Sequence, residues 1–402
     1  MAEKALDGVK VLEFASFVTG PYCVKLLADL GAEVIKIEKT GVGDEARRRG
    51  PFPNDIPHSE RSGLFLYLNT NKLGITLNVN SQTGKGIFKQ LVEWADILVE
   101  DNPPKVIKEL GFNYETLKTI NPKLIMISIT PFGQTGPYRD YKAYGLNVSH
   151  GSGSGYLTPM PESEAELGPI KGGGFFEDYC DGLSAAAATL AALYWREMMG
   201  QGQHVDVSKQ EASMSLDRVE VGLYAAEGKV SSRVRKGGTI GFQRTKNGHA
   251  LINIGDDRHW KALTKIIGHP EWTKEERFKN RESREKNSQE LYALIAERLE
   301  TLDGEVLYHE AQSAGIPAGV VRSPGDLIER DEQLKARGFF VTIDHPVAGK
   351  LTYPSSPYRL SETPWTVERP APTLGEHNEA VYSKLLGYSK EELVKLSEAG
   401  II

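Results

Sequence analysis

Residues 9–38 contain the succession strand, helix, strand, and this pattern restricts the fold more than any other part of the chain. Residues 9–14 predict a strand, residues 20–30 predict a helix that stops at Gly31, and residues 33–38 predict the second strand. A crossover helix of this length joins parallel strands. We therefore expect an α/β fold that is built on a parallel sheet.

The second predicted strand ends at Glu38, where nicotinamide-binding folds place the acidic residue that holds the ribose. The first turn of such a fold needs the pattern G-x-G-x-x-G, which lets the pyrophosphate approach the helix. Residues 15–21 lack this pattern. A nicotinamide-dependent dehydrogenase is therefore disfavoured as an alternative.

Further elements and a change of composition predict how the chain is divided. Strands are expected at 74–79, 96–99, 122–129, 204–207 and 250–254, and helices at 82–94, 106–110 and 210–227. Residues 145–174 are expected to form a loop. The expected division is a large domain at 1–205, a linker helix and segment at 206–244, a small α+β domain at 245–330, and a tail at 331–402 that returns to the large domain.

The composition is that of a globular protein without unusual partners. Of the 402 residues, 40% are apolar and 25% are charged, and the net charge of −6 argues against nucleic acid as a partner. Two cysteines are too few for a disulfide framework, so we expect a cytoplasmic protein. No apolar run reaches the length of a membrane span, and no spacing of histidines and cysteines predicts a metal site.

One stretch, residues 172–203, combines flexible, acidic and apolar segments. Three glycines lead to Asp178, an alanine-rich apolar run follows, and Gly200 ends it. We interpret Asp178 as the N-cap of a helix that is buried on all sides, with Asp181 in its first turn. The positive end of a helix favours a carboxylate, and the glycines admit a bulky ligand. Asp178 is therefore a candidate nucleophile, although most aspartates in this position only cap a helix.

Other nucleophiles and anion sites are less well supported by the sequence. Cys180 has no adjacent base or cation that would turn its thiol into a thiolate, so we expect it to pack. Residues 39–49 combine glycines with clustered cations, which fits either an anion site or a solvated loop. Residues 151–155 do not form the G-x-S-x-G elbow, because the middle residue is Gly153.

A series of short motifs extends along almost the whole chain. They are Gly43-Asp44 with Arg47, Leu68-Asn69-Thr70-Asn71-Lys72, the run from Phe132 to Pro137, Asp178 with Gly182, the run from Gly200 to Gln203, the run from Ala314 to Pro317, and the run from Leu374 to Asn378. In order and content these motifs resemble those of family III CoA-transferases, the group that contains formyl-CoA:oxalate and carnitine CoA-transferases.

The resemblance implies roles for particular residues. Asp178 takes the position of the nucleophile, which carries first an acyl group as an anhydride and then CoA as a thioester. Coenzyme A enters as a thioester substrate, and no permanently bound cofactor is expected. Oxyanion donors are expected from the glycine backbone at 172–174 or 151–155. The CoA contacts carried over are Val18 near the adenine, Lys39, Arg47, Leu68, Asn71 and Lys72, with Lys105 or Lys108 compensating where Glu109 replaces a basic residue.

The resemblance also implies an architecture and partners. A large Rossmann-like domain and a small α+β domain are expected, in an interlocked dimer that is either a homodimer or a heterodimer with a related subunit. The substrates are an acyl-CoA and a free carboxylic acid, with no nucleic acid and no membrane. Residues 231–244 lack the tetraglycine loop of the formyl-CoA type, which leaves the choice of acid open.

Two alternatives stay open within the same resemblance. A 2-methylacyl-CoA racemase would use Asp178 with His150 as bases, and a non-catalytic subunit would bind CoA without turnover. The acids are not named by the sequence. Four aromatic residues near Asp178 favour an apolar or aromatic acceptor with succinyl-CoA as donor, as in benzylsuccinate CoA-transferase; they are Tyr144, Phe175, Phe176 and Tyr179.

Overall fold

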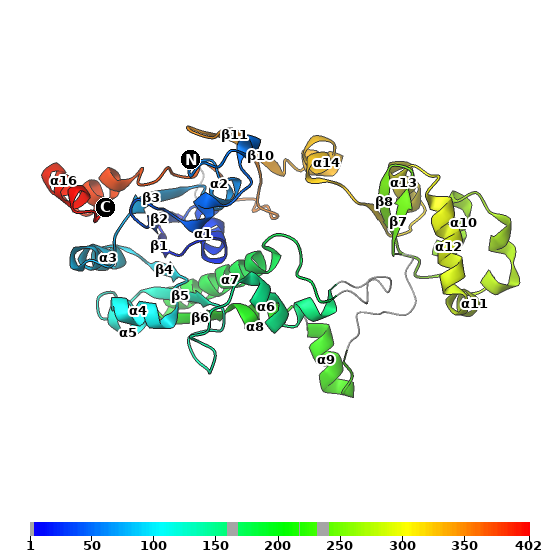
Figure 1. Cartoon of the computed structure of the whole chain (residues 1–402), viewed down its shortest axis with the longest axis horizontal. Coiled ribbons are helices and arrows are strands. Elements are labelled where there is room, and N and C mark those ends of the chain that lie inside the picture. The colour runs from blue at the N-terminus through cyan, green and yellow to red at the C-terminus, as the bar shows by residue number, and fades with distance from the viewer. Residues whose placement is uncertain (1–3, 159–167, 217, 231–240) are drawn as a thin grey trace. The chain divides into compact units, whose positions relative to one another are not determined.

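The computed structural model describes residues 4–158, 168–216, 218–230 and 241–402 (Figure 1). The chain forms two compact units. Unit 1 comprises Met1–Arg233 and Phe339–Ile402, and unit 2 comprises Val234–Gly338. Each unit has its own sheet and its own core.

Six parallel strands form the main sheet of unit 1, in the order β3-β2-β1-β4-β5-β6. Their bounds are β1 (Lys10–Phe14), β2 (Glu33–Glu38), β3 (Lys72–Thr76), β4 (Ile97–Glu100), β5 (Ile125–Thr130) and β6 (His204–Ser208). The order of strands reverses between β1 and β4, so a crevice is expected beyond their carboxyl ends. The prediction of an α/β fold with a parallel sheet is confirmed.

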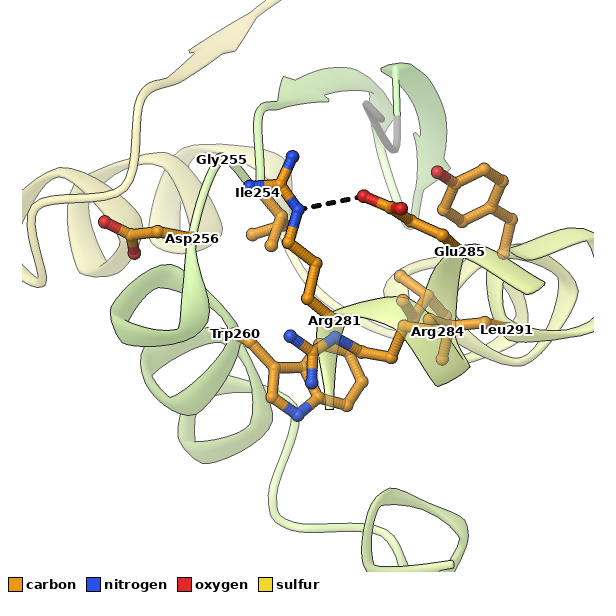
Figure 2. Close-up of a pocket in the computed structure, with 10 residues that line it drawn as sticks. Ile254, Gly255, Asp256, Trp260, Arg281, Arg284, Glu285 and Leu291 are labelled. Carbon is orange, nitrogen blue, oxygen red and sulfur yellow. Dashed lines mark hydrogen bonds and ion pairs between the residues drawn. The ribbon is translucent and has the colours of Figure 1, made fainter. Parts of the chain in front are cut away.

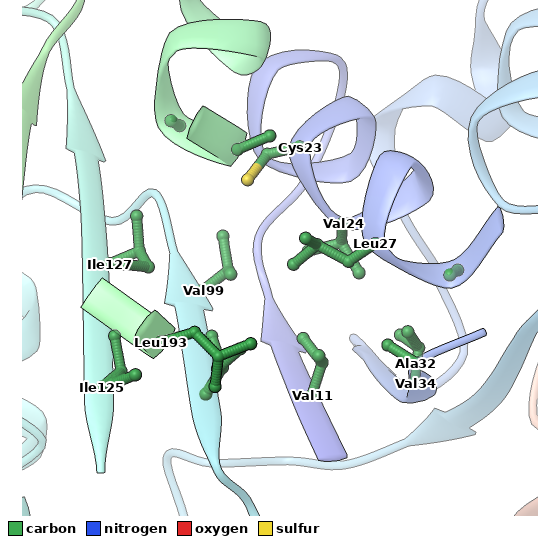
Figure 3. Packing of buried hydrophobic residues seen from close by; sticks show 14 of the residues in the cluster. Val11, Cys23, Val24, Leu27, Ala32, Val34, Val99, Ile125, Ile127 and Leu193 are labelled. Atoms are coloured by element: carbon green, nitrogen blue, oxygen red, sulfur yellow. The ribbon is translucent and has the colours of Figure 1, made fainter. Parts of the chain in front are cut away.

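Helices cover both faces of this sheet. The helices of unit 1 are α1 (Thr19–Asp29), α2 (Gly63–Leu68), α3 (Gln82–Trp94), α4 (Pro104–Leu110), α5 (Tyr114–Leu117), α6 (Gly145–Gly151), α7 (Phe176–Met199), α8 (Lys209–Met214), α9 (Arg218–Glu227) and α16 (Lys390–Glu398), of which α1 and α7 pack on one face of the sheet and α3 on the other. Neighbouring strand residues point to opposite faces. Val11 packs with Leu27 of α1 and Leu193 of α7 (Figure 3), whereas Leu12 packs with Phe88 of α3 on the other face.

Four charged side chains are buried beside β1. The Lys36 Nζ lies 2.8 Å from both Glu13 Oε1 and Asp44 Oδ2, and the Lys72 Nζ lies 2.7 Å from Glu13 Oε2. Burial opposes the charge of Lys36, but Asp44 and Glu13 outweigh it and raise its pKa, while burial lowers the pKa of Lys72 to about 8. Asp44 accepts a hydrogen bond from the N–H of Phe17, whose φ is 69°. The cluster thereby fixes the loop between β1 and α1.

The C-terminal part of unit 1 covers the edge strand β3. The N–H of Gly74 donates to His377 Nδ1 (3.1 Å), and the N–H of Thr76 donates to Asn378 Oδ1 (2.9 Å). The Tyr382 hydroxyl donates to the carbonyl of Thr76 (2.6 Å). These side chains occupy backbone groups that an exposed edge would offer to another strand. The run from Leu374 to Asn378 therefore has a structural role. Residues 339–354 add the antiparallel pair β10 (Phe340–His345) and β11 (Gly349–Pro354).

Two expectations about the helix that carries Asp178 are wrong. The helix begins at Phe176 with Phe175 in the cap position, so Asp178 lies in the first turn. Its carboxylate does not cap the helix, because it contacts side chains from other elements instead. The helix is also not buried on all sides, since the apolar side chains of Leu183 and Tyr194 are 55% and 68% exposed.

Two further expectations are corrected around this helix. Residues 145–174 are not a continuous loop: they contain α6 and a short 3-10 helix at Ser154–Leu157, while residues 159–167 lie outside the described part of the chain. The N–H of Tyr144 donates to Asn147 Oδ1 (3.0 Å) at the start of α6, and Val148 is buried beneath it. The helix expected at 210–227 is divided, because α8 ends at Met214 and α9 begins at Arg218.

Unit 2 has an α+β architecture with an antiparallel sheet in the order β7-β8-β9. Its elements are β7 (Gly241–Thr245), β8 (Gly248–Ile252), β9 (Ala318–Val320), α10 (Asp257–Ile266), α11 (Arg281–Lys286), α12 (Ser288–Leu299), α13 (Gly304–Ser313), α14 (Pro324–Glu329) and α15 (Glu332–Ala336). Figure 2 shows a pocket of this unit in which Arg281 pairs with Glu285 (2.8 Å) and Arg284 lies over the ring of Trp260. Of the segment 231–244, whose sequence lacks the tetraglycine loop, residues 231–240 lie outside the described part of the chain.

Candidate functional site

Three carboxylates gather at the start of α7. Glu177, Asp178 and Asp181 are all buried, with at most 6% of each residue exposed. The first turn of a helix carries unpaired N–H groups and a partial positive charge, which favours anions there. Three acids in one buried turn still need cations or donors from neighbouring elements.

The Oδ1 atom of Asp178 has two donors, and both come from other helices. Thr19 Oγ1, at the first residue of α1, donates a hydrogen bond of 3.2 Å to it. Lys209 Nζ, at the first residue of α8, forms an ion pair with the same oxygen. Gly182 allows α1 and α7 to approach, because a Cβ on it would lie 2.7 Å from the carbonyl of Thr19. The glycine of the D-x-x-x-G motif therefore has a packing role.

The Oδ2 atom of Asp178 faces the backbone of α6. A Cβ placed on Gly145 would lie 2.8 Å from this oxygen. On the same helix, Ser149 donates a hydrogen bond of 2.8 Å to Glu177 Oε1, and Lys171 forms an ion pair of 3.0 Å with Glu177 Oε2. The helix that sequence reasoning missed is thus a wall of the site.

Asp181 lies one turn further along α7 and is only partly satisfied. Ser213 Oγ donates a hydrogen bond of 2.9 Å to its Oδ1, whereas Oδ2 is buried without a hydrogen-bond partner among the described residues. Burial raises the pKa of Asp181 to about 7, although Lys209 acts in the opposite direction. Asp181 can therefore change its charge near neutral pH.

The crevice beyond the carboxyl ends of β1, β2 and β4 contains one of the expected CoA contacts. Lys39 is exposed and lines this crevice together with Ser16, Arg48 and Asn102. The sequence names Arg48 only as one of the clustered cations at 39–49, where an anion site was one of two interpretations, and not as a separate CoA contact. Lys105 is 76% exposed and lines a different pocket, with Lys108, Arg139 and His204.

The other expected CoA contacts have partners within the chain. The guanidinium of Arg47 makes two hydrogen bonds of 2.7 Å to Glu38 and one of 2.6 Å to Glu60, and its side chain is buried. Lys72 belongs to the buried charge cluster beside β1. Asn71 binds the C-terminal tail through the carbonyl of Thr366 and the N–H of Glu368, both at 2.8 Å.

Val18 and Leu68 are buried in one apolar cluster with Phe65. The structure therefore brings Lys39 into the crevice, and it gives Arg47, Asn71 and Lys72 internal contacts.

The remaining candidates are distributed around the site. His150, the second base of the racemase alternative, is exposed on α6, and its ring lies against Gly155. Burial raises the pKa of the Cys180 thiol, which fits a packing role. Phe175 and Tyr179 pack edge-on against Phe17 and Tyr22. Tyr144 and Phe176 are 77% and 63% exposed.

Within residues 4–158, 168–216, 218–230 and 241–402, no three histidine, cysteine or carboxylate side chains are grouped to hold a metal ion. Across these same ranges, no helix combines the length and apolar character needed to cross a bilayer.

Comparisons with known proteins agree on one family. A model of CoA-transferase family III matches residues 6–378. The formyl-CoA:oxalate CoA-transferase of Streptomyces coelicolor is 33% identical, over 100% of both chains. The succinyl-CoA:glutarate CoA-transferase of Mus musculus is 30% identical, over 99% of this chain and 90% of that protein. A crystal structure of a CaiB/BaiF family protein from Brucella suis has a TM-score of 0.85 and 31% identity, over 95% of this chain and 99% of that chain.

Proposed function

Because the chain belongs to CoA-transferase family III, we propose that it moves CoA from an acyl-CoA to a free acid through covalent intermediates on Asp178. The observation that carries this proposal is the arrangement of the Asp178 carboxylate. One oxygen is held by Lys209 and Thr19, and the other faces Gly145. In such a buried carboxylate, one oxygen is fixed by its donors and the other faces a glycine that has no side chain. This arrangement is suited to a nucleophile.

A carboxylate nucleophile preserves the energy of the thioester at every step. Asp178 attacks the acyl carbonyl of the donor, which gives a mixed anhydride and CoA thiolate. The thiolate attacks the aspartyl carbonyl and releases the donor acid, which leaves an aspartyl-CoA thioester. The acceptor acid attacks this thioester to form a second anhydride, and the thiolate then takes the new acyl group. A hydroxyl nucleophile would instead be trapped as a stable ester.

We assign the CoA nucleotide to the crevice beyond β1, β2 and β4. Lys39 and Arg48 are the cations that line it, and they suit the phosphates of CoA. Lys105, exposed at the start of α4, is a third cation that we assign to this ligand. The other residues matched to family contacts do not line this crevice, and we propose that they support its walls from within the chain; they are Val18, Arg47, Leu68, Asn71 and Lys72.

The names of the relatives guide the choice of substrates to test. The relatives from Streptomyces coelicolor and Mus musculus are named for formyl-CoA with oxalate and for succinyl-CoA with glutarate. We propose succinyl-CoA as the donor, with a free acid that contacts the exposed rings of Tyr144 and Phe176. The first screen therefore combines succinyl-CoA and formyl-CoA with oxalate, glutarate, benzylsuccinate and simple aromatic acids.

Isotope transfer into Asp178 tests the proposed chemistry. When the acceptor acid carries ¹⁸O, its attacking oxygen bridges the second anhydride and stays on Asp178 after CoA takes the acyl group. We expect the peptide that contains Asp178 to gain ¹⁸O during turnover, as measured by mass spectrometry after digestion. Transfer of CoA without ¹⁸O in this peptide would contradict the proposal. A racemase would instead place solvent deuterium on the α-carbon of the acyl group.

We also propose that the chain is a homodimer through the exposed apolar face of α7. Leu183, Leu190, Tyr194 and Met198 follow one another at helical spacing, and each is between 38% and 68% exposed. Light scattering during gel filtration is expected to give twice the chain mass of 44.3 kDa. A mass of one chain, or a dimer that persists when Leu190 and Tyr194 are both replaced by lysine, would contradict this assignment.

A further inference from the structure

The two oxygens of the Asp178 carboxylate lie in different surroundings, and the difference assigns each a role. We propose that Oδ2 is the oxygen that bonds to the acyl group, and that Lys209 and Thr19 form the oxyanion site for reactions at the aspartyl carbonyl. This inference rests on the proposed function, because it concerns intermediates on Asp178. For the second and third of the four steps, it assigns the oxyanion donors to these two side chains instead of the glycine backbone at 172–174 or 151–155.

The path of the electrons shows why Oδ1 needs donors. In the second step, the CoA sulfur bonds to Cγ of Asp178, and the carbonyl electron pair moves onto Oδ1. The pair then returns to re-form the carbonyl, the bond between Cγ and Oδ2 breaks, and Oδ2 leaves in the carboxylate of the donor acid. In the third step, the acceptor carboxylate attacks the same carbon and expels the thiolate. Both tetrahedral intermediates therefore place their negative charge on Oδ1.

The donors to Oδ1 are in place before the reaction begins. The side chain of Lys209 is 13% exposed, and Thr19 is buried. Ser208, the last residue of β6, caps α8 through the N–H of Glu211 (3.3 Å), which fixes where Lys209 starts. Donors that are fixed and shielded from water stabilise a developing charge without reorganising. In the first and fourth steps, the charge develops on the acyl oxygen, which belongs to the substrate.

Acylation of Asp178 changes the charge balance around Lys209. The anhydride and the thioester are neutral, so the ammonium of Lys209 loses its anionic partner in both states. The nearby Lys171 is already paired with Glu177, and Asp181 stays close to Lys209 with one oxygen free of hydrogen bonds among the described residues. Both species that attack Cγ, the CoA thiolate and the acceptor carboxylate, are anions. Lys209 therefore attracts each nucleophile to the carbon that it must reach.

The backbone of α6 provides space at the other oxygen. Since a Cβ on Gly145 would lie 2.8 Å from Oδ2, the absent side chain leaves room where the acyl carbon bonds. Gly86 on α3 offers a control, because it is exposed and a Cβ there would have no atom within 4 Å. Neither glycine has a positive φ, so alanine fits the backbone at both positions.

A rapid-quench experiment with succinyl-CoA and formyl-CoA measures the first two steps separately. It thereby distinguishes the role of Oδ2 from the role of the donors to Oδ1. The first step is followed as enzyme-dependent acyl hydroxamate formed with hydroxylamine, and the second as the protein–CoA adduct seen by intact mass spectrometry. In Lys209→Met we expect the rate of adduct formation to fall about 100-fold to 1,000-fold, with formation of the acyl hydroxamate retained. Thr19→Val likewise lowers the rate of adduct formation and retains formation of the acyl hydroxamate, and Lys209→Arg restores part of the adduct rate that Lys209→Met loses.

Control variants and the wild-type protein distinguish a failure of this inference from a failure of the proposed function. Lys118→Met removes an exposed lysine of another ion pair and leaves both signals unchanged. Gly145→Ala lowers the hydroxamate signal, and Gly86→Ala does not. Equal losses of both signals in a folded Lys209→Met protein, or a wild-type rate in Gly145→Ala, would overturn the inference. If the wild-type protein forms no CoA adduct with either acyl-CoA, the proposed function fails instead.

Discussion

We expect the replacement of Asp178 by asparagine to lower kcat/KM for CoA transfer by about 10,000-fold or more, which is the scale seen when an enzyme loses its covalent nucleophile. The amide of asparagine keeps the shape of the side chain, and its oxygen still accepts hydrogen bonds from Thr19 and Lys209. It cannot form an anhydride, however, so no acyl group and no CoA is transferred through it. The measurement is the steady-state rate of transfer with the donor and acid found in the substrate screen.

The control for Asp178→Asn is a variant with the same substitution at an aspartate away from the site. Asp344 is exposed on β10, so Asp344→Asn changes one charge without touching the site and is expected to keep full activity. Thermal unfolding of both variants checks that the fold persists. A residual rate within tenfold of the wild type in Asp178→Asn would exclude this carboxylate as the nucleophile.

The largest effect on stability is expected from Lys36→Met. The ammonium of Lys36 is completely buried between the carboxylates of Glu13 and Asp44, and it also donates to the carbonyl of Ala15 at 3.0 Å. Removal of one partner leaves buried charges unpaired, and such losses destabilise proteins by about 3–5 kcal/mol. We expect the free energy of unfolding, measured in urea, to fall by this amount.

Two further variants show whether unpaired charge is the cause. Lys89 is exposed on α3, so Lys89→Met is expected to change the free energy of unfolding by about 0.5 kcal/mol or less. The double variant Lys36→Met with Glu13→Gln removes one of the stranded carboxylates and is expected to recover part of the loss. Equal stability of Lys36→Met and the wild type would mean that the cluster is not held by these charges.

The sequence predicts the sheet of unit 1 well, because its strands are short apolar runs between helices of clear periodicity. Glu33–Glu38 and Gln82–Trp94 have the bounds that the pattern predicts. The pattern cannot place the start of α7, because an aspartate that caps a helix and one that lies in the first turn leave the same local sequence. Only the tertiary partners of Asp178 distinguish the two.

The partners of Asp178 could not be predicted from local sequence. Thr19 lies 159 positions before Asp178 and Lys209 lies 31 positions after it, so only the folded sheet brings them together. One signal was present, since Lys209 directly follows the strand at His204–Ser208. The carboxyl ends of parallel strands meet at one edge, so polar residues directly after such strands merit attention.

Cations in motifs are ambiguous for a physical reason. A lysine or arginine after a strand can bind a phosphate or can neutralise a buried carboxylate, and both uses need the same residue at the same place. Arg47 and Lys72 have buried carboxylate partners, whereas Arg48 lines the crevice. The sequence shows the cation, and only the fold shows which anion it meets.

The cover over β3 has a consequence for how the protein is made. The groups that cover this edge strand come from residues near 377–382, which the ribosome adds only after all of unit 2. Until then, the nascent chain carries an open strand edge that can pair with the same edge of a neighbouring nascent chain. Correct maturation of this enzyme therefore depends on residues that are synthesised after unit 2, and any delay in translation before residues 377–382 prolongs the period in which the chain can aggregate.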